Sequence, residues 1–181
     1  MRCDVAPLLH LDSGFDLRPA ASSDAPTIAW WMAKPHIQKW WEQDWSVERW
    51  AQAIEEQLAG EHSIPCLTAV DGEDFAYAEL YRVRHDRLAE YYTWQERDWG
   101  IHVAIGDAER LGRGLGRRLL RALAEALLRA DPLSQRVVAE PDVTNLPSIR
   151  AFEAAGFVIH AELELPEKKA LLMVHTRTVE A

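Results

Sequence analysis

Three glycines alternate within residues 111–116, which read LGRGLG, and a leucine-rich helical pattern follows at once. A glycine-rich turn that opens a helix points several backbone N–H groups and the positive end of the helix dipole at one place, where an anion can bind. The GxGxG spacing is neither a Walker motif nor a dinucleotide fingerprint. The chain has a net charge of −9, yet five arginines fall within twelve residues that contain no acid: Arg110, Arg113, Arg117, Arg118 and Arg121. The pattern predicts a polyphosphate site rather than a flexible loop before a solvated helix.

Two stretches resemble the acyl-CoA-binding motifs of the GNAT N-acyltransferases. The loop LGRGLGRRLL resembles their pyrophosphate loop, and NLPSIRAFEAAGF resembles the helix after their fifth strand. The resemblance implies an α/β GNAT fold, a mixed sheet of about seven strands with about four helices. It also implies acetyl-CoA or another acyl-CoA as co-substrate and no metal. The residues that it implies for binding the acyl-CoA are Val103, Ala104, Ile105, Leu111, Gly112, Arg113, Gly114, Leu115, Gly116, Arg117, Asn145 and Phe152. Leu111 departs from the usual Gln or Arg, a change that a backbone contact tolerates.

The expected strand WGIHVAI contains a candidate catalytic histidine. Strand alternation places His102 between Gly100 and Ala104 on one face, which leaves room for a substrate beside the imidazole. This histidine is a candidate general base or hydrogen-bonding orienter, or else a core histidine. Asp142 follows the next parallel strand, where it is a candidate to orient His102 or to bind the acceptor amine, or else it only forms a turn.

Two GNAT subfamilies are similar to this chain. The stretches WMAKPHIQKWW, GIHVAIGD and VVAEPDVTNLPSIRAFEAAGF resemble the siderophore acyltransferases, which acylate N-hydroxylysine-type or N-hydroxyornithine-type amines. That resemblance implies His102 and Asp142 as the catalytic pair, acting by direct attack in a ternary complex. The aminoglycoside 6′-N-acetyltransferases, the alternative, carry Asp in place of His102 and Tyr in place of Phe152. A protein N-acetyltransferase and a non-catalytic acyl-CoA-binding module also remain open.

Phe152 occupies the position where many GNAT enzymes have a tyrosine that protonates the departing thiolate. Phenylalanine cannot donate a proton, so a less demanding reaction is favoured. A lysine-like amine, with a pKa near ~10.4, must lose a proton before attack, whereas a less basic N-hydroxyamine is largely neutral at pH 7.

Aromatic residues crowd the first half of the chain, and all eight tryptophans lie within the first 99 residues. Trp31 and Trp50 are expected to face the core, while Trp40, Trp41 and Trp45 fall in a connection between helices. Acceptor-pocket candidates are, in part through the resemblance, His36, Trp40, Trp41, Glu79, Tyr81 and Tyr92. For the tryptophans the alternative is packing under a loop, and for Glu79 it is a solvated strand position.

The periodicity predicts the order β-α-α-β-β-β-α-β-α-β-β. Asp24 is expected to cap a helix that Pro35 ends, and Ser46 and Asn145 to cap two later helices. Strands are expected at 15–20, 64–70, 75–83, 99–105, 136–140, 157–164 and 169–176. The unit from residue 99 to residue 140 is a crossover, which makes its strands parallel and favours a ligand at their carboxyl ends.

Composition limits the remaining possibilities. A length of 181 residues predicts one domain, 1–181. A net charge of −9 disfavours nucleic acid and anionic membranes as partners. Cys3 and Cys66 form no metal-binding pattern, and there is no long apolar run, so we expect a cytoplasmic protein. The resemblance implies a small-molecule amine or N-hydroxyamine as the acceptor. The oligomeric state stays open, a homodimer included.

Overall fold

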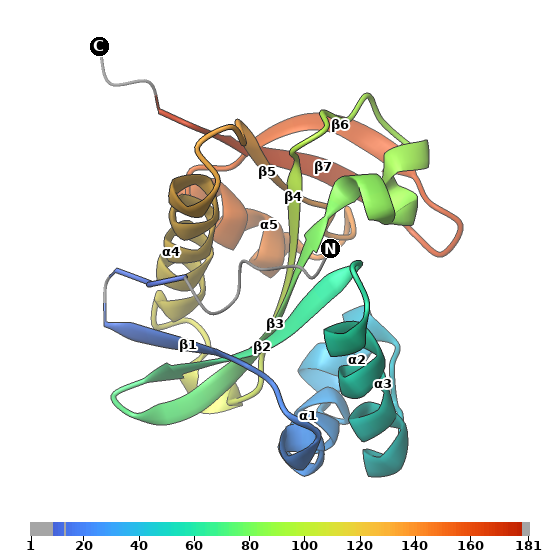
Figure 1. The fold of residues 1–181 in the computed structure, drawn as a ribbon, viewed down its shortest axis with the longest axis vertical. Coiled ribbons are helices and arrows are strands. Elements are labelled where there is room, and N and C mark those ends of the chain that lie inside the picture. Colours follow the sequence, from blue (N-terminus) through green and yellow to red (C-terminus); the bar gives the residue numbers. More distant parts are fainter. Residues whose placement is uncertain (1–8, 13, 179–181) are drawn as a thin grey trace.

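The computed structural model describes residues 9–12 and 14–178. A seven-stranded sheet forms its centre, in the order β1-β2-β3-β4-β5-β7-β6 (Figure 1). The strands are β1 (Phe15–Pro19), β2 (Ser63–Val70), β3 (Glu73–Arg82), β4 (Trp99–Ile105), β5 (Arg136–Ala139), β6 (Val158–Glu164) and β7 (Lys169–Thr176). Only β4 and β5 are parallel neighbours, as the predicted crossover requires. The mixed α/β fold with seven strands is confirmed.

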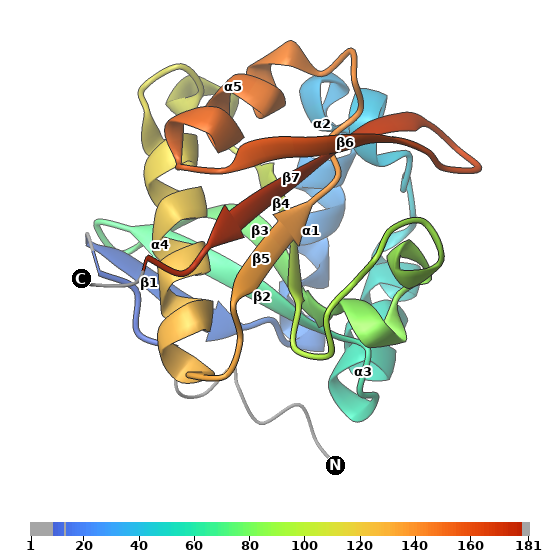
Figure 2. The same cartoon turned by 90° about the horizontal axis from the view of Figure 1, so that it is seen from above.

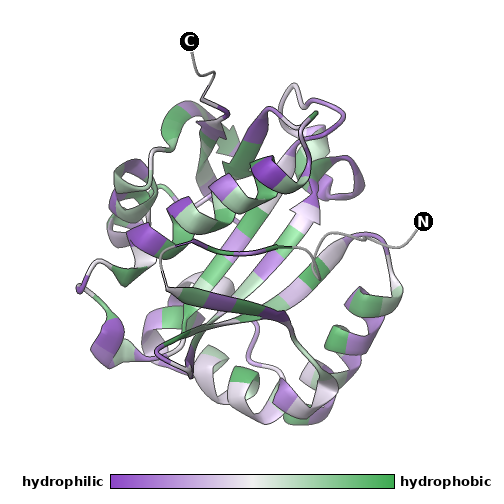
Figure 3. Ribbon diagram, turned by 60° about the vertical axis from the view of Figure 1, so that its left-hand side comes forward, coloured by the Kyte–Doolittle hydropathy of each residue, from purple (hydrophilic) through white to green (hydrophobic). Residues whose placement is uncertain are grey.

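Helices cover both faces of the sheet. One face carries α4 (Leu115–Ala130) and α5 (Leu146–Ala154), while the other carries α1 (Ala25–Met32), α2 (Pro35–Trp41) and α3 (Val47–Ala59) (Figures 1 and 2). Hydrophobic residues follow the strands between these layers, and hydrophilic residues recur along the covering helices (Figure 3). Burial of these apolar faces stabilises the fold.

The sequence predicted four helices, and α2 is a fifth that it did not include. Pro35 does not end a helix but opens one, at a first-turn position where its missing N–H costs nothing. Lys34 is extended, with ψ 137°, and separates α2 from α1. Trp40 and Trp41 therefore lie on a helix rather than in a connection.

Side-chain caps explain the ends of two other helices. Ser46 accepts a hydrogen bond from Arg49 N at 3.3 Å, and Asn145 accepts one from Ser148 N at 3.3 Å, as predicted. Asp24 stands at the N-cap position of α1, as predicted, but its side chain does not cap the helix. Its carboxylate makes no cap hydrogen bond to α1 and instead accepts from Arg18 at 2.7 Å and from Ala21 N at 2.8 Å.

The parallel strands β4 and β5 separate soon after they meet. Their register contains two pairs, Trp99↔Val137 and Gly100↔Val138. Beyond these pairs, the last part of β4 has no β5 partner, and the chain after β5 pairs with β7 instead. The sheet is consequently split at the carboxyl ends of its parallel strands, where α/β proteins bind ligands.

The core confirms several predicted burials. Trp31 and Trp50 are 3% and 1% exposed, and Cys66 is a buried free thiol, whereas Cys3 lies outside the described residues. Within the described chain, none of the helices combines the length and apolar character needed to cross a membrane.

Candidate active site

The glycine loop folds back against the end of β4. Gly112 and Gly114 have φ values of 72° and 77°, in the left-handed region that glycine adopts without strain. Gly114 is the N-cap of α4 and provides no side-chain cap, so the first N–H groups of that helix are left for another acceptor. A Cβ on Gly116 would lie 3.2 Å from Ile105 Cδ1, which shows how closely the loop approaches the strand.

The five arginines of this region differ in their interaction partners. Arg110 forms ion pairs with Asp107 at 3.2 Å and with Glu73, and Arg121 donates to Ala154 O at 2.9 Å. Arg118 lies over the ring of Phe15. Within the described residues, Arg113 and Arg117 have no ion-pair or hydrogen-bond partner. These two are therefore the arginines available to an anion at the loop.

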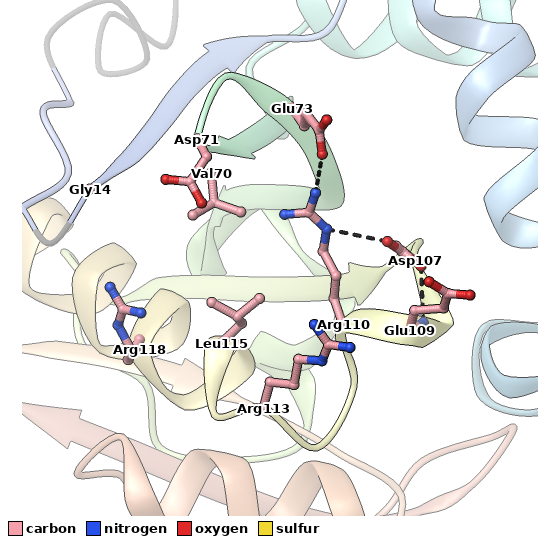
Figure 4. A pocket seen from close by; sticks show the side chains of 10 residues that line it. All are labelled: Gly14, Val70, Asp71, Glu73, Asp107, Glu109, Arg110, Arg113, Leu115 and Arg118. Carbon is pink, nitrogen blue, oxygen red and sulfur yellow. Dashed lines mark hydrogen bonds and ion pairs between the residues drawn. The ribbon is translucent and has the colours of Figure 1, made fainter.

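Two hollows flank the start of α4. Figure 4 shows the larger one, of about 610 Å³, in which Arg110 lies between Glu73 and Asp107. It is lined by Gly14, Val70, Asp71, Glu73, Asp107, Glu109, Arg110, Arg113, Leu115 and Arg118. The smaller, of about 350 Å³, is lined by Arg117, Arg118, Arg121 and Ala154. The larger hollow includes Arg113 of the loop, the smaller is lined by residues of α4 and α5, and neither is lined by His102.

The second part of the site is a group of side chains that we call the His102 cluster: His102, Glu79, Tyr81 and Glu140. His102 Nε2 lies 2.7 Å from Glu140 Oε1, and its Nδ1 lies 3.4 Å from Glu79 Oε2. Tyr81 Oη donates to Glu140 Oε2 at 3.2 Å. The cluster lies where β4 leaves β5, because Glu79 is the cross-strand partner of His102 and Glu140 directly follows β5.

A glycine outside the loop makes room for this cluster. Gly100 pairs with Tyr81 across the strands, and a Cβ at Gly100 would lie 2.1 Å from Tyr81 Cζ. The tyrosine ring therefore occupies the space of the missing side chain, and from there its hydroxyl reaches Glu140.

His102 carries a positive charge in this arrangement. Both ring nitrogens face carboxylates, which only accept hydrogen bonds when ionised, so both nitrogens must donate. Burial by itself lowers the pKa of His102, but Glu140 and Glu79 outweigh it and raise the pKa to about 10. Burial likewise raises the pKa of Glu140, but His102, Lys168 and Tyr81 lower it to about 2. The resting imidazole therefore has no free lone pair with which to act as a base.

Residues from two helices complete the surroundings of Glu79 and His102. Glu79 Oε1 accepts from Gln57 Nε2 of α3 and from Tyr77 Oη, both at 2.9 Å. Trp41 of α2 meets the His102 ring edge-on, with ring centroids 5.8 Å apart. His102 remains 33% exposed, so its ring is accessible from this side of the sheet.

Among the described residues Asp142 makes no hydrogen bond to His102, which gives its predicted orienting role no support, while its alternative role in binding the acceptor amine stays a prediction. Its carboxylate accepts from Thr144 N at 2.7 Å and from Thr144 Oγ1 at 2.5 Å, so it forms the turn that was the alternative. Glu140, two residues earlier, holds the histidine instead. Sequence reasoning missed Glu140 and Gln57. Glu140 is the residue that ends the predicted strand 136–140, next to the strand of His102, and this position was the available signal.

Comparison with known proteins assigns the family. Residues 20–165 match the acetyltransferase (GNAT) domain. The chain belongs to the GNAT family and is an acyltransferase. It is 39% identical to the lysine N-acyltransferase MbtK of Mycolicibacterium paratuberculosis (strain ATCC BAA-968 / K-10), over 83% of this chain and 68% of that protein. It is 31% identical to the N(6)-hydroxylysine O-acetyltransferase of Escherichia coli, over 86% of this chain and 49% of that protein.

A solved structure of the same fold holds both kinds of substrate. The structure of AAC(6′)-Ib in complex with paromomycin and acetyl-CoA superposes with a TM-score of 0.81. It is 28% identical and covers 91% of this chain and 94% of that one. Acetyl-CoA is thus bound by a relative of this GNAT enzyme.

The remaining predicted site residues of the GNAT enzyme have definite places. His36 Nε2 contacts Ile105 O at 2.9 Å and so holds the end of β4. Phe152 is buried and packs edge-on against Phe157, and Tyr92 Oη donates to Asp98 at 2.8 Å. Trp40 is half-buried beneath Lys39. Among the described residues, no three His, Cys, Asp or Glu side chains gather to hold a metal ion.

Proposed function

We propose that this acyltransferase transfers an acyl group from acyl-CoA to the nitrogen of a small N-hydroxyamine of the siderophore-precursor type. The observation that carries the proposal is His102, held as an imidazolium between Glu79 and Glu140 at the split between β4 and β5. Two relatives, named a lysine N-acyltransferase and an N(6)-hydroxylysine O-acetyltransferase, support an acceptor of this class. We also propose that it works in the cytoplasm, where a free thiol such as that of Cys66 stays reduced.

The donor half of the proposal rests on the glycine loop. Backbone N–H groups from Gly112 to Gly116 would bind the CoA pyrophosphate at the start of α4, with Arg113 and Arg117 adding positive charge. The part of β4 that has no β5 partner would pair with pantetheine. This arrangement would bring the thioester carbonyl to the split between β4 and β5, next to His102.

The reaction follows from the charges of the cluster. The acceptor nitrogen bonds to the thioester carbon, the C–S bond breaks with its electron pair on sulfur, and the proton lost by nitrogen ends on the thiolate. His102 is already protonated, so we assign it an electrostatic and orienting role. The charges of His102 and Lys168 offset those of Glu79 and Glu140, so these four side chains do not by themselves favour an ammonium over a neutral nucleophile.

An aminoglycoside 6′-N-acetyltransferase is the second candidate. The likeness to AAC(6′)-Ib with paromomycin bound favours it, as does a net charge of −9, which attracts polycations. Net charge acts at long range and is screened by salt, whereas the cluster acts at contact distance. We therefore place this function second.

A transfer assay with purified protein tests the proposal. Thiol release from acetyl-CoA, succinyl-CoA and longer acyl-CoAs is measured with N6-hydroxylysine, lysine and kanamycin at pH 7. We expect N6-hydroxylysine to react fastest, and its kcat/KM to lack the steep rise with pH that lysine shows. Faster turnover of kanamycin would overturn the choice of acceptor. CoA binding without transfer to any amine would identify a binding module.

A further inference from the structure

Lys168 lies beside the His102 cluster because of how the β6–β7 hairpin is held. Leu165 N donates to Lys168 O at 2.9 Å, which closes the turn. The start of β7 then pairs with the segment after β5, through Val143 N to Lys169 O at 3.0 Å and Leu171 N to Pro141 O at 2.9 Å. Figure 2 shows the hairpin turn projecting well past the end of β5. This pairing brings Lys168 beside Glu140, whose Oε1 lies 3.9 Å from its Nζ.

The Lys168 side chain is mostly buried, and its ammonium group has donors to spare. Its side chain is 22% exposed, and among the described residues it makes the Glu140 contact at 3.9 Å and no hydrogen bond. A lysine ammonium has three N–H donors, and shielding a charge without partners is unfavourable. Glu140 has little capacity left, because His102 and Tyr81 already donate to its two oxygens.

Two neighbouring cations have close carboxylate partners. Lys169, the next residue, contacts Glu162 at 3.2 Å and Glu164 at 2.8 Å on the outer surface. Arg87 donates to both carboxylate oxygens of Glu167. Lys168 is thus distinguished from its neighbours by unused donors on a shielded side chain that borders the His102 cluster.

We propose that Lys168 binds a carboxylate of the acceptor, so that the preferred acceptor is an ω-N-hydroxy amino acid rather than an N-hydroxydiamine or a polycation. The inference rests on the proposed function. An ammonium and a carboxylate form charge-assisted hydrogen bonds, which are stronger than neutral ones. The reacting nitrogen and the carboxylate are at opposite ends of such a molecule, so one can reach the split while the other meets the hairpin. A polycation would meet Lys168 as a like charge, which selects against it.

Two acceptors that differ only in the carboxylate test this assignment. Initial rates with acetyl-CoA are measured for N6-hydroxylysine and N-hydroxycadaverine, using the wild type, Lys168→Gln and Lys168→Arg. Lys169→Gln is the matched control, since it removes a neighbouring charge that faces away from the site. We expect the wild type to prefer N6-hydroxylysine. Lys168→Gln should lower the ratio of the two kcat/KM values about 10- to 100-fold, mainly through KM.

The outcomes separate this inference from the proposed function. A carboxylate contact is supported if Lys168→Arg keeps most of the ratio of the two kcat/KM values and Lys169→Gln keeps all of it. Equal kcat/KM values for both acceptors in the wild type would overturn this inference alone. An equal loss of kcat/KM with both acceptors in Lys168→Gln would also overturn it, because Lys168 would then only support Glu140. If neither N-hydroxyamine is acylated, the proposed function is wrong and the carboxylate contact with it.

Discussion

The glycine loop and the His102 cluster are built by opposite means. The loop is one continuous segment whose useful groups are backbone N–H groups, exposed because Gly112 and Gly114 adopt left-handed conformations. The cluster is made of side chains from β3, β4 and the residue after β5, each held by a partner from another element. A site made from backbone tolerates side-chain changes, whereas a site made from interlocked side chains depends on every member.

The largest effect on turnover is expected from His102→Ala. Losing the imidazolium removes the charge that orients the acceptor, so kcat should fall roughly 10²–10³-fold, with little change in CoA affinity. Steady-state kinetics and calorimetry with CoA measure the two quantities. Because the variant removes the cation between Glu79 and Glu140, its folding must be checked, and His102→Ala combined with Glu140→Gln relieves the repulsion between the two carboxylates. Unchanged kcat in a folded variant would contradict the role.

On the loop, a side chain should matter only where it enters the anion site. Gly114→Glu places a carboxylate at the start of α4 and strains a residue with φ 77°, so CoA affinity should fall roughly 100-fold or more. Gly72→Glu is the matched control, since Gly72 has φ 78° in the β2–β3 turn and open space around it. Calorimetry with CoA decides, and equal affinity in both variants would remove the loop from the donor site.

Glu140→Gln tests the charge state of the cluster. Without the carboxylate, the pKa of His102 should fall from about 10 toward its ordinary value, and kcat should drop about tenfold or more. Titration of the His102 ring by NMR should show a wild-type imidazolium throughout pH 5–8. A wild-type ring that loses its proton near pH 6.5 would restore His102 as a candidate general base.

The pH dependence of the free energy of unfolding should follow the ion pair of His102 and Glu140. The pKa of His102 is raised in the folded state, so its contribution is complete below about pH 6.5 and is lost as the pH rises toward about 10. The pKa of Glu140 is lowered from 4.5 to about 2, so its contribution is present above about pH 4.5 and is lost on acidification. Denaturation should therefore show a larger difference between wild type and Glu140→Gln at pH 6 than at pH 9.5. A difference that grows toward high pH would refute the assignment.

The smallest effect is expected from the unpaired arginines. Arg117→Ala should weaken CoA binding only about 2- to 5-fold, and less at high salt, because an exposed charge contributes little beside the backbone groups. Arg110→Ala serves as the comparison, since Arg110 is occupied by Glu73 and Asp107. A larger loss from Arg110→Ala than from Arg117→Ala would mean that side chains, not backbone, define the donor site.

The contrast also explains what the sequence could predict. The glycine loop, the strand of His102 and the caps Ser46 and Asn145 are local patterns, and sequence spacing was enough to place them. The partner of His102 was not local. Whether Glu140 or Asp142 reached the histidine depended on where β5 ends and how the next residues pair with β7, which single-chain periodicity does not specify.

The helix α2 was missed for a related reason. Pro35 is compatible with the end of one helix and with the first turn of the next, and seven residues are too few to show a helical period. That error moved Trp41 into a connection, although it belongs on a helix that packs against His102.

Gly100 and Tyr81 constrain each other in evolution. Because the ring of Tyr81 fills the space of its absent side chain, any larger residue at this position must push the ring away from Glu140. A descendant of this protein could exchange Gly100 only after Tyr81 had become smaller, and it would lose one of the groups that hold Glu140 in doing so. The two positions should therefore drift together or not at all.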